Sequence, residues 1–228
     1  MRIIVLTILI GLNFIHAQST GYGIRGGLGL SSQRWASGSD RDPLLTYHGD
    51  FTIDIESEKG NVFYIATGYH QRGSAIIFSR FVDQNGNTQP GGSFGMKFHN
   101  VGLEIGVKKA RKLESWKVLY GVGARVEYNA KTQIDVFPEY TDFIVRTTAG
   151  LSLHGSVERN LNKFVVFGLE GRVSPDFTRQ IYVPPGTPYF DPTTGGVRNG
   201  PEQSIRNFGI ELSLTLKFLQ IIEYIEEY

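Results

Sequence analysis

Apolar and polar residues alternate along most of this chain. In WKVLYGVGARVEYN, residues 116–129, every second residue is apolar or aromatic, and the residues between them include glycines, an arginine and a glutamate. Successive side chains of a β-strand point to opposite faces, so this alternation predicts a strand. We expect a long strand with one apolar face and one face that mixes glycine with charge.

The same alternation recurs in seven further segments, and no segment with helical periodicity precedes the last ten residues. The additional strands are expected at 22–30, 47–56, 61–78, 94–108, 143–154, 165–173 and 207–218. Within 94–108, Phe94, Met96 and Phe98 are out of phase with Val101 and the alternating residues that follow it. A β-bulge near His99 and Asn100 would explain this change of phase.

The connections between the expected strands alternate between two kinds. SEKGN, ARKLES and ERNLNK are short and charged, whereas the other connections are long and rich in Gly, Pro, Asn and Asp. Short turns at one end and long loops at the other are typical of outer-membrane barrels, whose short turns face the periplasm. An even number of strands also places both chain ends on the periplasmic side.

The polar faces decide between a soluble β-protein and a membrane barrel. An eight-stranded barrel has an interior just wide enough for side chains, so glycines make room there and buried charges must pair. We expect an interior charge network that plugs the barrel rather than leaving a pore. Its members are Arg25, Asp54, Glu56, Glu104, Arg125, Glu127, Arg146, Glu170, Arg172 and Glu211.

Aromatic residues near the strand ends match the interfacial girdles of a membrane barrel. We expect Tyr22, Phe63, Trp116 and Phe218 at the periplasmic rim and Tyr47, Tyr128 and Phe143 at the outer rim. The predicted fold is therefore all-β, an eight-stranded antiparallel up-and-down transmembrane β-barrel.

The first residues read as a secretory signal peptide, with Arg2 before an apolar run and a small residue, Ala17, at its end. We expect a signal peptide at 1–17, an outer-membrane barrel at 18–218 and a periplasmic tail at 219–228. The tail is interpreted either as a short amphipathic helix or as an extension of the last strand. The formal net charge of +1 gives no sign of a nucleic-acid partner, and the absence of cysteine excludes disulfides and thiolate metal sites.

Several short motifs resemble the small PorT-like outer-membrane β-barrels of Bacteroidota. They are GIRGGLGLS (23–31), LEIGVK (103–108), GLEGRVSPDF (168–177) and LSLTLKF (212–218). Arg25 stands where that family often has Lys, and Gly106 replaces a frequent proline. The resemblance implies the barrel fold and a bacterial outer-membrane location, and it carries over no catalytic residue. Members of that family include accessory factors of secretion and gliding systems and many proteins of unknown role.

Candidate chemistry is sparse in this sequence. Small barrels include lipid hydrolases and acyltransferases, in which a His acts with a Ser and a carboxylate. His48, with Asp50 two residues on, is the better placed candidate, and His154 has Ser152 on its own strand. We favour hydrogen-bonding roles for both histidines, and we expect no catalytic, cofactor or metal site.

The last long loop, 178–204, is rich in proline and aromatic residues. Prolines lower the entropy cost of ordering a loop, and aromatic side chains can anchor a partner. This loop is expected either to bind a partner or to cover the barrel mouth. Its candidate binding residues are Tyr182, Pro184, Pro185, Tyr189 and Phe190.

The leading hypothesis is a non-enzymatic structural or accessory component of an envelope complex for secretion or assembly. Its expected partners are outer-membrane lipid and envelope proteins. A ligand-binding barrel or narrow pore is the alternative, and a lipid-modifying enzyme comes third.

Overall fold

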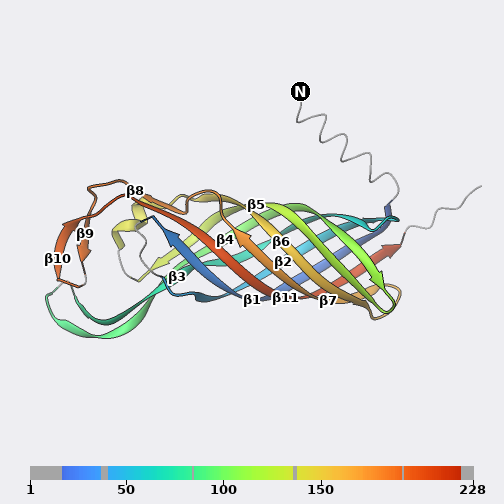
Figure 1. The fold of residues 1–228 in the computed structure, drawn as a ribbon, viewed down its shortest axis with the longest axis horizontal. Coiled ribbons are helices and arrows are strands. Elements are labelled where there is room, and N and C mark those ends of the chain that lie inside the picture. The colour runs from blue at the N-terminus through green and yellow to red at the C-terminus, as the bar shows by residue number, and fades with distance from the viewer. Residues whose placement is uncertain (1–16, 37–40, 84, 136–137, 192, 222–228) are drawn as a thin grey trace, which may run out of the picture.

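The computed structural model describes residues 17–221, apart from 37–40, 84, 136–137 and 192. In this part of the chain, eight long antiparallel strands form a closed ring in which the last strand pairs with the first (Figure 1). The predicted all-β, eight-stranded antiparallel barrel is confirmed. The wall strands are β1 (Ala17–Trp35), β2 (Leu44–Ser57), β3 (Asn61–Val82), β4 (Thr88–Leu113), β5 (Trp116–Ile134), β6 (Thr147–Asn160), β7 (Val165–Pro175) and β11 (Gln203–Ile221).

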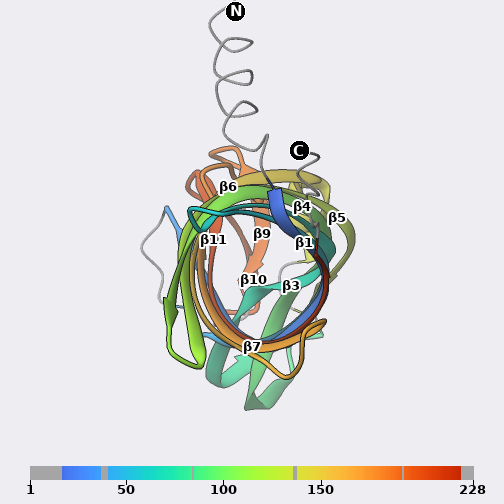
Figure 2. The same ribbon diagram turned by 90° about the vertical axis from the view of Figure 1, so that its right-hand side faces the viewer.

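The two ends of the barrel differ as expected. Short turns join β2 to β3, β4 to β5 and β6 to β7 at one end, which Figure 2 views along the barrel. Ser19 of β1 pairs with Ile221 of β11, so both ends of the described chain lie at this short-turn end. The long connections all lie at the other, outer end (Figure 1).

The outer connections contain small elements of their own. They are the 3-10 helix η1 (Pro138–Phe143) and the strands β8 (Ile181–Val183), β9 (Pro188–Asp191) and β10 (Gly196–Asn199). β8 extends the wall beside β11, and β9 pairs with β10 in a separate hairpin. Within the described residues, no helix has the length and apolar character needed to cross a membrane.

Apolar side chains cover the outside of the barrel. Leu28, Ile105, Val122 and Leu212 are among many large apolar residues that are 39–59% exposed. Alternation sends their neighbours in sequence to the inside of the wall. A continuous outward apolar surface of this kind is what the hydrocarbon core of a bilayer requires.

A bulge interrupts the pairing of β4 with β5. His99 lies opposite Lys131, but Asn100 lies opposite Asn129, so Ala130 is the extra residue and belongs to β5. The predicted irregularity at His99 and Asn100 is therefore confirmed in position.

The expected change of phase within β4 is wrong. Met96 and Phe98 are buried on the same inward face as Asn100 and Glu104. The extra residue of the bulge lies in β5, so the alternation of β4 is not interrupted. Toward the outer end, the residues on the inward face of β4 become apolar. Sequence periodicity alone does not distinguish an apolar interior from an inverted strand.

Two strand limits also differ from expectation. β6 begins at Thr147 rather than at 143, and Phe143 belongs to η1, where it is half-buried rather than part of the outer girdle. β11 continues to Ile221, so residues 219–221 of the expected tail extend the last strand, which was one of the two interpretations of the tail. The expected signal peptide, except Ala17, and tail residues 222–228 lie outside the described residues.

Candidate functional site

Charged side chains fill the inside of the barrel and are almost completely buried. A lone buried charge costs several kcal/mol, so an interior of this kind requires opposite charges in contact. The cations are Arg25, Arg72, Lys108, Arg125, Arg172 and Lys217, and the acids are Asp50, Asp54, Glu104, Glu127, Glu158, Glu170, Asp176 and Glu211. We call this set the interior network.

The layer nearest the short turns is built around Lys217 of β11. Its ammonium group contacts the carboxylate of Asp54 on β2 and, at 2.6 Å, Glu158 Oε1 on β6. Lys117 and Glu56 form a further, partly exposed ion pair at the edge of this layer. These pairs link strands that are not neighbours in the ring.

Two glutamates organise the middle layer. Glu170 contacts Lys108 at 2.6 Å, His154 Nδ1 at 3.0 Å and the guanidinium of Arg25. Glu104 lies 2.7 Å from His154 Nε2 and 3.2 Å from Arg172 Nη1. His154 therefore bridges two carboxylates at the centre of the barrel.

Arginines and acids alternate through the outer layer. Arg72 Nη2 donates to Glu127 Oε1 at 3.0 Å, and Arg125 Nη1 donates to the same oxygen at 2.8 Å. Arg125 also contacts Asp176, and Glu211 joins Arg72 at 3.0 Å. The network thus runs without a break across the width of the barrel.

Two glycines make space for these buried groups. A Cβ added at Gly123 would lie 2.1 Å from Tyr64 Oη, and one added at Gly209 would lie 2.2 Å from Arg72 Nη1. Real Cβ atoms do not approach so closely, so a side chain at either position would displace Tyr64 or Arg72. The glycines of the inward faces are therefore part of the packing of the network.

The structure brings most of the predicted network residues together. Arg25, Asp54, Glu104, Arg125, Glu127, Glu170, Arg172 and Glu211 are buried and paired, and Glu56 is paired at the short-turn edge. Arg146 is a correction, because it is exposed and hydrogen-bonds Tyr128 Oη at 3.3 Å. It precedes β6, so the strand alternation that would have turned it inward does not apply to it.

Sequence reasoning left several members out of the network. Lys108 and Lys217 lie on the inward faces of the expected strands 94–108 and 207–218, so the alternation already marked them. Glu158 continues the inward parity of 143–154 and needed only a longer strand. Arg72 lies on the inward face of the expected strand 61–78, opposite in parity to Tyr69. Asp176 continues the parity of Glu170 and Arg172 but lies beyond the expected end of that strand at 173.

Among the described residues, neither His48 nor His154 belongs to a Ser–His–carboxylate triad. His48 Nε2 lies 2.7 Å from Ser213 Oγ, but His48 Nδ1 is buried and has no partner among the described residues. Ser152 Oγ donates to Glu104 at 2.9 Å rather than to His154. His154 lies in the middle layer, between Glu104 and Glu170. Within the described part of the chain, no group of three or more His, Asp or Glu side chains is arranged to hold a metal ion.

An apolar cluster lies across the outer end of the barrel interior. It joins the tops of β1, β4 and β11 to η1 and β8 and is made of Trp35, Met96, Phe98, Tyr140, Ile181, Val183 and Ile205. We call this cluster the apolar cap. The guanidinium of Arg41 lies 3.6 Å from the centre of the Trp35 ring, and burial lowers the pKa of Arg41 to about 10, so it stays charged at neutral pH.

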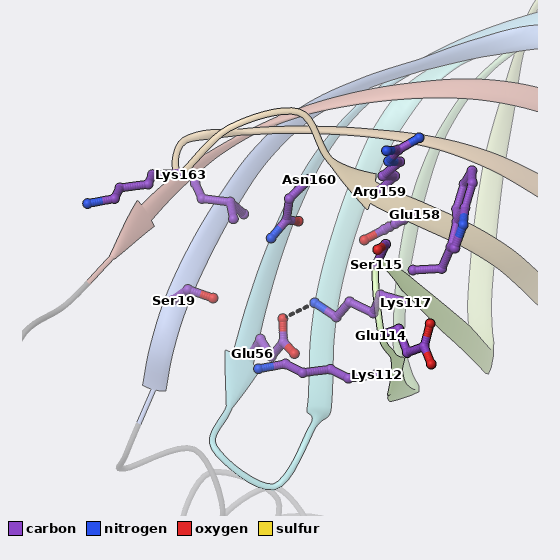
Figure 3. Close-up of a pocket in the computed structure, with 12 residues that line it drawn as sticks. Ser19, Glu56, Lys112, Glu114, Ser115, Lys117, Glu158, Arg159, Asn160 and Lys163 are labelled. Atoms are coloured by element: carbon purple, nitrogen blue, oxygen red, sulfur yellow. Dashed lines mark hydrogen bonds and ion pairs between the residues drawn. The ribbon is translucent and has the colours of Figure 1, made fainter.

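A cavity of about 630 Å³, which we call the vestibule, opens at the short-turn end (Figure 3). The Lys117–Glu56 ion pair lies at its centre, and Lys112 points toward it. Deeper in the barrel, a space of only about 20 Å³ remains among residues that include Val62, Leu119 and Lys217. The vestibule therefore ends where the interior network begins.

The last long loop combines covering and exposed parts. Tyr182 is half-buried, and the Arg179 guanidinium lies 4.6 Å from the centre of its ring. Tyr189 packs against the apolar cap and Phe190 is half-buried, whereas Pro184 and Pro185 are exposed at the turn before β9. Part of this loop thus covers the mouth, and its tip faces solvent.

The outer hairpins project beyond the wall (Figure 1). At the β3–β4 turn, the Asp83 carboxylate accepts the backbone N–H groups of Asn85 and Asn87 at 2.9 Å each. The bond from Asn87 is the main cause that holds the pKa of Asp83 below its usual value. A Cβ built on Gly195, between β9 and β10, would lie 2.9 Å from Val82, so the two hairpins lie against each other.

No family model matches this chain, and no curated protein matches it. The family resemblance carried by the sequence motifs therefore stays a prediction.

Among solved structures, the outer membrane protein OprG from Pseudomonas aeruginosa is similar, with a TM-score of 0.51 at 9% identity over 91% of this chain and 99% of that one. Neisserial surface protein A has a TM-score of 0.45 at 9% identity over 86% and 97% of the two chains. Ail of Yersinia pestis has a TM-score of 0.40 at 10% identity over 90% and 100%. The likeness to OprG shows the fold alone: this chain folds as a small eight-stranded outer-membrane β-barrel.

Proposed function

We propose that this protein is a non-enzymatic, non-conducting barrel of the bacterial outer membrane that acts as an accessory component of an envelope complex. In this role the wall anchors the protein in lipid, and the outer hairpins and the periplasmic end meet protein partners. The continuous plug inside the barrel is the observation that carries the proposal.

The plug argues against a pore. Ions or solutes would have to pass the pairs of Lys217, Arg25 and Arg72 with their acids and then the apolar cap. Moving these buried groups aside would separate opposite charges in a low-dielectric interior, which is costly. Planar-bilayer recordings of the refolded protein should therefore show no steady conductance, and large stable channels would contradict the proposal.

The geometry also gives no support to lipid-modifying chemistry. A Ser–His pair needs a carboxylate on the second imidazole nitrogen and access to substrate. His48 lacks the carboxylate, and Ser213 is buried inside the barrel, on the side away from lipid.

The partner role can be tested by removing the outer hairpin and asking whether a co-purifying protein is lost. Tagged wild-type barrel would be isolated from native membranes in mild detergent, beside a variant in which 188–199 is replaced by a short Gly-Ser linker. We expect a defined envelope protein to co-purify with the wild type. The proposal is contradicted if the wild type retains no protein beyond those retained by an unrelated eight-stranded barrel tagged in the same way.

The matched control for the hairpin variant changes the vestibule instead. Lys112→Ala and Lys163→Ala remove two cations at the short-turn end and leave the outer hairpins intact. Loss of the partner in only one of the two variants identifies the end that binds it. Equal retention in both variants would show that neither end contributes the contact.

The vestibule favours one second candidate, a ligand-binding barrel. A volume of about 630 Å³ lies within the range of small-molecule sites, roughly 300–1,000 Å³. Its lining is mixed in charge and is open to solvent, so the accessory role remains our first proposal.

A further inference from the structure

Two arginines lie directly opposite each other on the outside of the wall. Arg34, near the outer end of β1, pairs in register with Arg206 on β11, and both side chains are exposed. Their neighbours Trp35 and Ile205 are buried in the apolar cap. Alternation along both strands therefore directs the two guanidinium groups away from the barrel interior.

Such an arrangement is unfavourable for an isolated barrel. Side chains directly opposite on antiparallel strands have Cβ atoms about 4.5–5.5 Å apart, and like charges at these positions repel each other. Among the described residues, the side chains of Arg34 and Arg206 form no ion pair and no hydrogen bond. Every arginine of the interior network, in contrast, contacts at least one acid. An anion held between Arg34 and Arg206 would remove the repulsion.

A third arginine lies on the same part of the surface. The carbonyls of Ile205 and Asn207 accept hydrogen bonds from the backbone of Gln180 and Asp176, so residues 177–179 loop out opposite Arg206. Arg179 is exposed at the end of this loop. Three cations from separate segments thus flank one stretch of the wall.

The position of these arginines indicates what the anion is. Below them on the same two strands, Leu30, Phe208 and Ile210 are 41–52% exposed and face lipid. The cations therefore lie where the apolar surface ends, at the level of the headgroups of the outer leaflet. Arginine binds phosphate through two parallel hydrogen bonds, which suits it to a headgroup phosphate.

We propose that Arg34 and Arg206, with Arg179 beside them, bind the phosphate of an anionic lipid in the outer leaflet. The site lies on the outside of the wall and does not depend on the proposed accessory role.

Lipid retention on the detergent-solubilised barrel tests the site. Native mass spectrometry would compare lipid A carrying both phosphates with the same lipid after removal of its phosphates, and with inorganic phosphate alone. We expect the wild type to retain the phosphorylated lipid in preference to both. Arg34→Gln with Arg206→Gln should weaken that binding on the order of tenfold, because charged hydrogen bonds are lost.

The matched control removes two other cations from the wall toward its outer end. Lys97→Gln with Lys131→Gln changes the charge equally, but Lys97 lies opposite Gln133 and Lys131 opposite His99, so these lysines do not form an opposed pair. We expect this control to keep most of the binding. Equal losses in the two double variants would overturn the site, as would equal retention of the dephosphorylated lipid or binding of inorganic phosphate without the lipid.

A charge reversal gives an independent check. Arg206→Glu places a carboxylate opposite Arg34, so the pair becomes internally neutral and no longer needs an anion. We expect this variant to fold, since position 206 is exposed, and to lose the phosphorylated lipid. Unchanged retention in Arg206→Glu would also overturn the proposal.

Discussion

Arg125 shows how much a single buried residue contributes to the plug. Its guanidinium contacts Glu127 and Asp176, and Glu127 keeps a second cation, Arg72, at 3.0 Å. Asp176 has no other cation in contact within the described residues and otherwise accepts a hydrogen bond from Asn207. Loss of Arg125 therefore leaves Asp176 as the uncompensated charge.

Arg125→Leu should destabilise the barrel by about 3–5 kcal/mol, the usual cost of removing one partner of a buried ion pair. Urea unfolding in lipid vesicles measures this change. Adding Asp176→Asn should recover part of the loss, because the stranded charge is then removed. An unchanged unfolding midpoint for Arg125→Leu would contradict a packed, paired interior.

Arg146 supplies the matched control for that measurement. Arg146→Leu is the same substitution on an exposed side chain whose one hydrogen bond is to Tyr128. We expect it to change the free energy of unfolding by no more than about 0.5 kcal/mol. A loss as large as that of Arg125→Leu would show that the effect comes from removing any arginine.

Along the single strand β5, successive side chains alternate between the lipid-facing surface and the interior network. Val122 is 39% exposed between Val107 of β4 and Leu153 of β6, all on the lipid-facing side. Val122→Arg should cost about 2–4 kcal/mol, the range for a cation near the bilayer midplane. Val118→Lys should cost less, because a long side chain near the rim can reach the headgroups.

The same urea unfolding in vesicles compares these two β5 variants. A larger cost at Val118 than at Val122 would contradict the assumed position of the strand in the bilayer.

Strand alternation predicted the wall well because both of its faces have fixed chemistry, lipid outside and paired charge inside. It failed where that chemistry changes. At the outer end of β4, Met96 and Phe98 point inward into the apolar cap, so an apolar residue no longer marks the lipid side.

The cap itself could not be predicted from the pattern. It joins Trp35, Tyr140 and Ile181 from three distant parts of the chain, and their contact depends on how the loops fold back over the mouth.

Within the described residues, the two ends of the barrel differ, because an apolar cluster covers the interior at the outer end and a cavity opens at the short-turn end. The apolar cap and the interior network separate the vestibule from the outer hairpins. In an outer membrane with its short turns toward the periplasm, the vestibule opens to the periplasm and the hairpin tips face the outside. A water-soluble reagent should therefore reach the vestibule from the periplasm and the hairpin tips from outside the cell. It should not reach the interior network from either side.

Single cysteines test this arrangement cleanly, because the chain has none of its own. Val197→Cys replaces a side chain that is 74% exposed on β10, Ser115→Cys lies in the vestibule, and Ser152→Cys replaces a fully buried serine of the middle layer. With a membrane-impermeant maleimide, we expect Val197→Cys to be labelled in intact cells. Ser115→Cys should be labelled only after the outer membrane is permeabilised, and Ser152→Cys only after denaturation, because the network around it excludes the reagent. Labelling of Ser152→Cys in the folded protein would contradict the plug, and labelling of Ser115→Cys in intact cells would contradict the orientation.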